Sequence, residues 1–524
     1  MSGDIGGSAI DGPTSGGSTA PRRTGDGGGD RWLPSVTDAL NRPQPAWLCV
    51  LGWFAATGIF LALVAAFAGP GHFDPGESDY STWAIAHGDI ACAYPSVIPF
   101  EAPPVAPLYP LVSGGIAAIA RLGDSAPFPS AAALGPDCDK AFSAMNRWVE
   151  QTGVVGPTLW IGCVTWLALM AGVIAWLRAA GRGRRGWEPV TLMFVAGLLP
   201  VWMCVQTYFH PQDLLALGLA LCAMACACRR RWVAAGVLCA LAVLSQQFAL
   251  LVAAPLFVLA PATRKVSFAV GGLLTGAIVV IPLAVMTSGH VLRATALGTG
   301  DNASSGGTVL WETHAYGAAA VLLFRVAPLA VSVLLSSWVL RRLGPGALRP
   351  VAVMSLVAVS LALRLVFEAN FNSYYFMALA VTLVLLEATA GSVRRTVAAW
   401  LAAMTLWICR FSPLPFGVVG WGAYLQNDLI PFLVGVGALL GVLTLLLRGG
   451  DRRNLWPWLA VAAVDFVTLL PGGNELSTGR LFWAWQVILV VPGILLAAQP
   501  LLARIRQPGR TRTQGVEPAP SPAG

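Results

Sequence analysis

The chain has 524 residues, of which 56% are hydrophobic and only 11% are charged. A soluble globular domain carries about 25% charged residues, so this composition excludes an ordinary soluble protein. The net charge of +8 does not indicate a nucleic-acid partner, because the basic residues form short clusters between apolar runs rather than one stripe.

Apolar runs of about 20 residues, the length that crosses a bilayer, recur from Trp47 almost to the C-terminus. Residues 45–505 are therefore expected to form one all-α polytopic membrane domain, a bundle of about 12–14 transmembrane helices. The segment before it, 1–42, and the segment after it, 507–524, contain little apolar surface and are expected to be disordered cytoplasmic tails. The run that starts at Trp47 lies too far along the chain for a cleaved signal peptide and predicts the first membrane helix.

The basic clusters predict the topology. They lie at residues 22–42, 178–185, 229–231, 264–265, 341–349, 394–395, 448–453 and 504–512. Basic loops are retained in the cytoplasm, which predicts cytoplasmic termini and a multi-pass protein of the plasma membrane.

Helical spans are expected near 46–68, 154–177, 189–207, 212–228, 266–287, 315–340, 350–367, 374–390, 397–411, 428–447, 457–470 and 483–503. The apolar segment between Arg231 and Arg264 is too long for one helix and too short for two full crossings. It predicts a hairpin of two short helices that breaks near Ser245, Gln246 and Gln247.

The largest predicted outer loop, 69–153, is rich in acidic residues. Within it, Val105–Leu122 is apolar at helical spacing and is expected to lie along the membrane interface; a full extra span would reverse the later topology. Cys92 and Cys138 both fall in this loop, where an oxidising compartment permits a disulfide, and free thiols are the alternative.

Acidic residues follow the first span in Gly76–Tyr80, and Glu101 comes farther along the loop. A carboxylate there could act as general base on a sugar hydroxyl. The alternative is that Asp74, Glu77 and Asp79 are solvated loop acids.

The order Asp79-Tyr80, then Gly88 and Tyr94, then a Pro- and Tyr-rich stretch at 101–110 resembles the GT-C superfamily. Its members are polyprenyl-phosphate-sugar-dependent membrane glycosyltransferases, and the resemblance is to the bacterial mannosyltransferase-like ones. In that family an acidic residue near the start of a large first outer loop is the catalytic base. The resemblance implies that Asp79 is the base, with Asp74 and Glu77 as competitors, and that Tyr80 and Glu101 contact substrate.

A second group, His210 and Asp213, opens the span near 212–228. Two residues three apart in a helix can share one face. Their position resembles the His-and-Asp helix start of the same superfamily, where a second acid faces the active cavity. Pro211 and Asp213 also suit the first turn of any helix, and the two roles are compatible.

Gln246 and Gln247 interrupt an apolar stretch, and amides in hydrocarbon need partners. Related GT-C sequences often have Lys at such a point, so Gln247 is a substrate-binding candidate without the charge. Hydrogen bonding within the hairpin is the alternative.

A third group lies at the outer end of a later span and contains Arg364, Glu368, Tyr374 and Tyr375. Arginine suits a phosphodiester because its planar fork offers several donors, and the group resembles the GT-C segment that faces the lipid-phosphate donor. An Arg364–Glu368 pair with interfacial tyrosines is the structural alternative. Arg410 is a further phosphate candidate, or a residue that snorkels to the interface.

The chain contains no Gly-Lys-Ser/Thr phosphate loop, no dinucleotide fingerprint and no His-Glu-x-x-His zinc pattern. Neither a metal nor a cofactor is expected. The GT-C resemblance implies transfer of a hexose such as mannose, or a pentose, from a polyprenyl-phosphate carrier to an extracytoplasmic glycan, lipid or protein acceptor, with inversion. The rival hypotheses are a transporter or lipid-linked-sugar flippase, and a non-catalytic assembly subunit.

Overall fold

The computed structural model describes residues 32–66, 74–94, 106–121, 138, 155–206, 210–292, 318–367, 376–393, 395–401, 403, 498, 501–502 and 505. These residues form helices and turns, and their only strand-like feature is an isolated bridge between Pro43 and Arg185. Within this part of the chain, five helices are long and apolar enough to cross a membrane. They are α2 (Ala46–Ala66), α7 (Val155–Ala179), α10 (Pro211–Cys228), α13 (Ala262–Met286) and α16 (Ala318–Leu343).

Shorter elements complete the described fold. They are α1 (Trp32–Asn41), α3 (Asp74–Ala86), η1 (Ile90–Ala93), α4 (Leu108–Arg121), α8 (Trp187–Ala196), α9 (Leu199–Gln206), α11 (Trp232–Ser245), η2 (Gln247–Ala249), α12 (Leu250–Leu259), η3 (Gly344–Leu348), α17 (Pro350–Phe367) and α18 (Phe376–Ala390). The expected all-α membrane architecture is confirmed at this level. The predicted spans 428–447 and 457–470 lie outside the described residues, as do most of 397–411 and 483–503.

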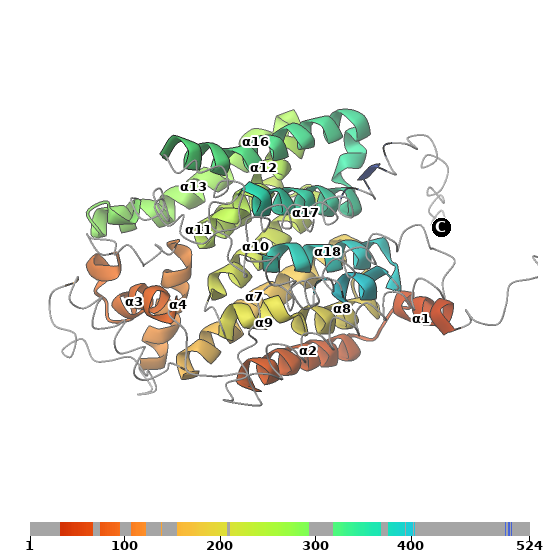
Figure 1. The fold of residues 1–524 in the computed structure, drawn as a ribbon, viewed down its shortest axis with the longest axis horizontal. Coiled ribbons are helices and arrows are strands. Elements are labelled where there is room, and N and C mark those ends of the chain that lie inside the picture. Colours follow the sequence, from red (N-terminus) through yellow and green to blue (C-terminus); the bar gives the residue numbers. More distant parts are fainter. Residues whose placement is uncertain are drawn as a thin grey trace, which may run out of the picture.

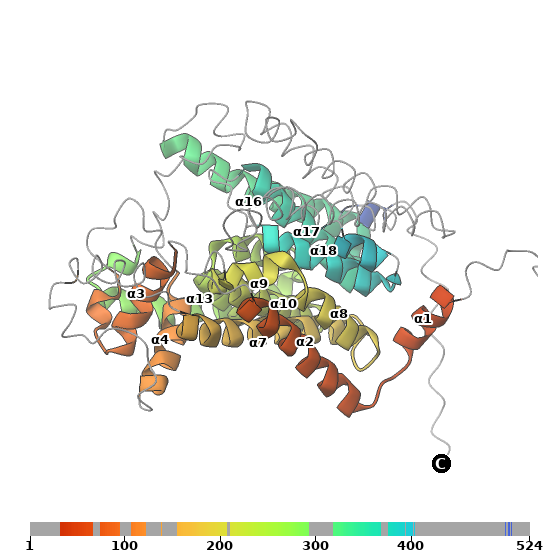
Figure 2. The same cartoon turned by 60° about the horizontal axis from the view of Figure 1, so that its bottom comes forward.

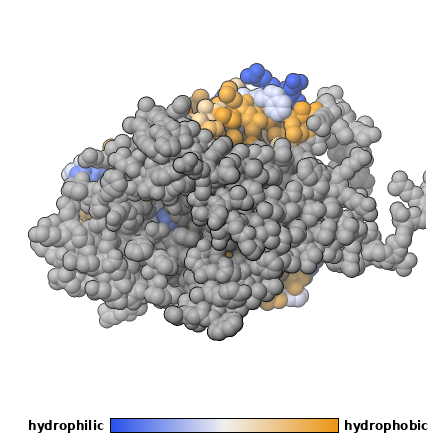
Figure 3. Space-filling model, viewed as in Figure 1, coloured by the Kyte–Doolittle hydropathy of each residue, from blue (hydrophilic) through white to orange (hydrophobic). Residues whose placement is uncertain are grey.

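Helix α10 lies at the centre of the bundle. Within its spanning segment 78% of the residues are buried, against 17% in α13. It packs along α7 and α11, whereas α13 and α16 expose large apolar side chains such as Leu273 and Leu334. Figure 3 shows such an apolar surface over α16. An apolar outer face is what a bilayer requires of a spanning helix.

Helices α7 and α10 run in the same direction. Gly162, near the start of α7, lies against Val205, which closely precedes α10; farther along, Gly172 lies against the backbone of Gly218. Small residues at such crossings allow the backbones to approach closely. The C-terminal ends of both helices, which lead into Arg178–Arg185 and Arg229–Arg231, therefore lie at the same end of the bundle.

Other basic segments lie at that end too. The indole of Trp176 in α7 donates a hydrogen bond of 2.9 Å to Thr389 Oγ1 at the end of α18. Gly236, early in α11, lies against Phe268, early in α13, so these two helices start side by side. We call this the basic end of the bundle. It gathers Arg178–Arg185, Arg229–Arg231, Arg264, Lys265 and Arg395, as the positive-inside pattern predicts.

The opposite end carries α3, η1 and α4. Tyr80 and Trp83 of α3 pack with Leu283 near the end of α13 and with Val291 just beyond it. In Figures 1 and 2, α3 and α4 lie at one extremity of the bundle and α1 at the other. The described parts of the segment 69–153 that form α3, η1 and α4 therefore lie at the end opposite the basic clusters.

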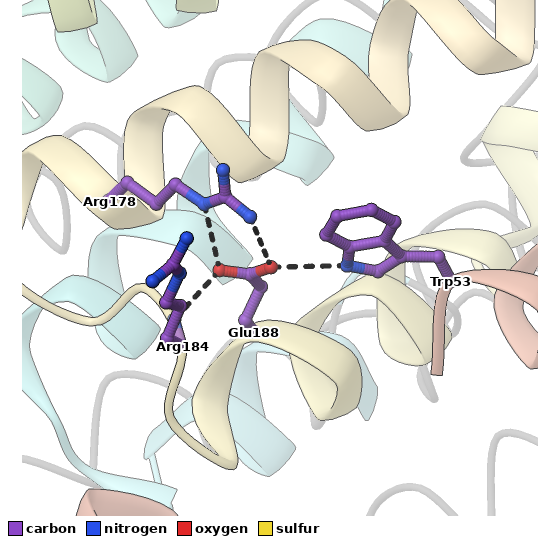
Figure 4. Close-up of polar contacts among 4 residues, drawn as sticks. All are labelled: Trp53, Arg178, Arg184 and Glu188. Carbon is purple, nitrogen blue, oxygen red and sulfur yellow. Dashed lines mark hydrogen bonds and ion pairs between the residues drawn. The ribbon is translucent and has the colours of Figure 1, made fainter. Parts of the chain in front are cut away.

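A buried carboxylate joins three helices at the basic end. Glu188 of α8 is fully buried and accepts hydrogen bonds from Arg178 Nε and Nη2 at 3.3 and 3.2 Å. It also accepts from the Trp53 indole of α2 at 3.1 Å and from the backbone N–H of Arg184 at 2.9 Å, as Figure 4 shows. The charge is thus paired and hydrogen-bonded, which a buried carboxylate needs.

The structure differs from expectation at the N-terminal tail, because residues 32–41 form α1. Leu40 packs against the core, and Asn41 Oδ1 accepts hydrogen bonds from Arg182 Nη1 at 2.8 Å and from the Trp187 indole at 3.1 Å. Burial lowers the pKa of the Arg182 guanidinium. Contacts made by the last turn, rather than local composition, order this helix.

One predicted span is interrupted, and one predicted break is present. The span near 189–207 is divided into α8 and α9 at Gly197 and Leu198, where Pro200 lacks the N–H that a continuous helix would need. The predicted break near Ser245–Gln247 is confirmed: α11 ends at Ser245, and α12 follows the short turn η2. Since α11 and α13 start side by side, α12 leads the chain back to the basic end.

Replacing Glu188 by Ala is expected to lower the free energy of unfolding by about 2 kcal/mol, because the partly exposed Arg178 loses its buried counter-charge and the Trp53 indole loses its acceptor. The measurement is denaturant unfolding of the purified protein in detergent. Asp38 is an exposed acid at the same end, and Asp38→Ala should change stability by less than about 0.5 kcal/mol. Equal effects of the two variants would show that the Glu188 contacts do not hold the helices together.

Replacing Gly218 by Ala is expected to destabilise the bundle by about 2 kcal/mol, since the added methyl group would meet the backbone of Ala168 and Leu169. The matched control is Gly276→Ala in α13, where the methyl group would meet open space. Thermal unfolding in detergent should show a lower midpoint for the first variant only. A normal midpoint for Gly218→Ala would contradict the close α7–α10 approach.

Candidate functional site

Polar residues from three parts of the chain meet at the end of α10 that is remote from the basic end. Asp213, in the first turn of α10, is 1% exposed. Its carboxyl group lies within electrostatic range of His210 and Arg364 and within hydrogen-bonding reach of the Gln246 side chain. We call His210, Gln212, Asp213, Gln246 and Arg364 the polar cluster.

Local sequence explains how α10 contributes. Pro211 occupies the first turn, where its missing N–H costs nothing. The backbone N–H of His210 donates to Cys204 O at 2.6 Å, and that of Asp213 donates to His210 O at 3.0 Å. A carboxylate in this turn also interacts favourably with the helix dipole. These contacts hold the His210 and Asp213 side chains at the start of a buried helix.

The break between α11 and η2 supplies the amide. Gln246 has extended backbone angles, and its side-chain carbonyl accepts a hydrogen bond of 3.1 Å from the N–H of Gln247. Phe248 follows and is buried. The guanidinium carbon of Arg364, in the last turn of α17, lies 5.5 Å from the Phe248 ring centroid. This cation–π contact positions a half-buried arginine beside Asp213.

The unit formed by α3, η1 and α4 is tied together by short hydrogen bonds. Ser81 Oγ donates to Ala93 O at 2.7 Å, and Thr82 Oγ1 lies 2.6 Å from Ser113 Oγ of α4. Tyr94 is buried, and burial raises the pKa of its hydroxyl, so it stays protonated. These contacts make a compact unit that holds the backbone of Asp79 in α3.

Of the two alternatives for Cys92 and Cys138, the structure has the disulfide, with 5.3 Å between the Cα atoms. The buried Tyr80 donates its hydroxyl to Cys138 O at 3.0 Å. The disulfide and the Tyr80 hydrogen bond thus attach Cys138 to the unit of α3 and η1.

The structure places three predicted site residues from two motifs, His210 and Asp213 on one side and Arg364 on the other, within electrostatic range of one another. The amide beside Asp213 belongs to Gln246, whereas the predicted Gln247 is exposed. Asp79 lies in α3 with its side chain outside the described part of the structure. Glu101, Glu368, Tyr374, Tyr375 and Arg410 lie outside the described residues.

Sequence reasoning missed Gln212 as a site residue. It is 4% exposed, and its Nε2 lies 2.8 Å from His210 Nδ1. The available signal was an uncharged amide in the first turn of an apolar span, where any polar side chain needs a partner.

The polar cluster offers both signs of charge. Arg364 provides several donors that suit a phosphate group, and Asp213 provides a carboxylate. Among the described residues no group of three or more His, Cys, Asp or Glu side chains is placed to hold a metal ion. The arrangement therefore suits an organic ligand with an anionic part and a polar uncharged part.

Comparison with protein-family models gave no match for this chain, and neither did a search of curated proteins.

The Asp213–Arg364 interaction should appear as a coupling free energy. We expect Asp213→Asn and Arg364→Gln to be non-additive, with a coupling of about 1–2 kcal/mol, because each removes a charge that the other senses in a buried setting. Denaturant unfolding in detergent of the single and double variants measures it. Asp38→Asn combined with Arg364→Gln should be additive. Additive effects of Asp213→Asn and Arg364→Gln would show that Asp213 and Arg364 do not interact.

Proposed function

We propose that the chain is an integral membrane glycosyltransferase of the GT-C type that uses a polyprenyl-phosphate sugar as donor. One observation carries the proposal: a histidine and a buried acid at the start of α10 lie within electrostatic range of each other and of an arginine of α17, at the end of the bundle opposite the basic clusters. Ionisable groups inside an apolar bundle are costly and are typical of functional sites.

The position of the polar cluster favours a lipid-linked donor. A nucleotide sugar is a cytoplasmic molecule, and a site for it is expected at the basic end, if that end faces the cytoplasm. The polar cluster lies among the helices at the other end, where a membrane lipid can bring its phosphate to Arg364. The proposed acceptor is a glycan, lipid or protein on that side of the membrane.

The proposed mechanism is a single displacement with inversion. Asp79 takes the proton of the acceptor hydroxyl, the hydroxyl oxygen bonds to the anomeric carbon, and the bond from that carbon to the phosphate oxygen breaks. The electron pair leaves with polyprenyl phosphate. Arg364, with Arg410, stabilises the negative charge that develops on the leaving phosphate. One role of Asp213 is to orient Arg364.

Labelled polyprenyl-phosphate mannose offered to membranes that contain the chain tests the proposal. We expect Asp79→Asn to lower transfer at least about 100-fold, because the amide cannot accept the proton. The matched control is Asp89→Asn: Asp89 is an exposed acid shortly after α3, and its replacement should leave transfer unchanged.

Equal transfer by wild type and Asp79→Asn would reject Asp79 as the base. Absence of transfer with mannosyl and pentosyl carriers alike would reject the enzyme. In that case, movement of the labelled carrier across reconstituted vesicles would assign the polar cluster to a transport path instead.

A further inference from the structure

Two buried acceptor oxygens in the first turn of α10 lack a donor. Gln212 Oε1 and Asp213 Oδ1 have no hydrogen-bond partner within the described residues, although their side chains are 4% and 1% exposed. A buried polar atom without a partner costs free energy. Two adjacent cases at the start of one helix indicate a place that a ligand completes.

The remaining contacts of these side chains determine what kind of ligand fits. The Nε2 of Gln212 lies 2.8 Å from His210 Nδ1, and an amide nitrogen can only donate. With the nitrogen directed at His210, the Gln212 oxygen is left as an acceptor. The missing partners must be donors.

The charges of Asp213 and Arg364 restrict the class of ligand further. An anionic group would be repelled by the Asp213 carboxylate at close range, whereas hydroxyl groups donate to carboxylate and amide oxygens alike. Arg364, within electrostatic range of Asp213, offers only donors and suits a phosphate. A sugar phosphate presents both kinds of group in one molecule.

We propose that Gln212 Oε1 and Asp213 Oδ1 bind hydroxyl groups of the donor sugar, while Arg364 binds the phosphate of the same molecule. The inference rests on the proposed function and extends it, because it orients the donor and makes Gln212 a specificity residue. The sugar lies over the first turn of α10, and its hydroxyl pattern is read there. Polar recognition of this kind discriminates strongly, since a ligand without the hydroxyl leaves buried acceptors unpaired.

The test compares two probes on the purified full chain in detergent: a short-chain polyprenyl-phosphate mannose and the same polyprenyl phosphate without the sugar. Wild type should bind the mannosyl form more tightly. Gln212→Met, which keeps the length but removes the acceptor, should weaken binding of the mannosyl form about tenfold, the factor that one hydrogen bond contributes. Binding of the bare phosphate should not change.

Three further variants make the result specific. Arg364→Gln should weaken binding of both probes by similar factors, because the phosphate is common to them. Gln212→Glu, which keeps an acceptor at the same length, should lose less discrimination than Gln212→Met. Thr191→Val removes another buried oxygen without a partner in the described residues, on α8, and should leave both affinities and the sugar preference as in wild type.

Equal binding of the two probes by wild type would overturn the inference, as would a full sugar preference in Gln212→Met. Transfer assays on the same preparations separate the two proposals. Transfer by wild type with no effect of Gln212→Met on sugar preference would reject the inference alone, whereas absence of transfer would reject the enzyme.

Discussion

The need to satisfy polar groups inside an apolar bundle governs this structure. In α13 only 17% of the spanning segment is buried, and that segment carries almost only apolar side chains, so few polar groups in it need a partner. The buried helices retain polar groups, among them the acids Glu188 and Asp213. Glu188 is completed by Arg178 and Trp53 at one end, and Asp213 is incompletely satisfied at the other.

Three acids are buried among the described residues, and one of them, Glu387, is paired with Arg395. The other two, Glu188 and Asp213, differ in a way that separates structure from function. Both carboxylate oxygens of Glu188 are hydrogen-bonded, and the contacts join α2, α7 and α8, so its surroundings explain its presence. Asp213 retains an oxygen without a donor among the described residues, beside an arginine and a histidine. An acid that the fold does not satisfy is the better candidate for contact with a ligand.

Several elements of the fold could be predicted because they depend on local pattern. The spans that begin near 46, 154 and 212 and the break near Gln246 follow from apolar length and from polar interruptions. Helix α1 could not be predicted in this way, because long-range contacts of Leu40 and Asn41 hold it. For the candidate site, the structure places Asp213 and Arg364 within electrostatic range of each other, and it places Gln246 rather than Gln247 within hydrogen-bonding reach of Asp213. Gln212, which contacts His210, was not among the candidates, and the roles of all these residues stay predictions.

The sequence by itself determined that this protein is a helical membrane protein, since hydrophobic runs and their basic flanks are read one segment at a time. It also determined which residue types could act at the site. Only the tertiary structure decided that Asp213, Gln246 and Arg364 meet, because their proximity depends on how α10, α11 and α17 pack. Helix packing is set by side-chain shape across contacts far apart in the chain, such as Gly172 against Gly218, and no local pattern encodes it.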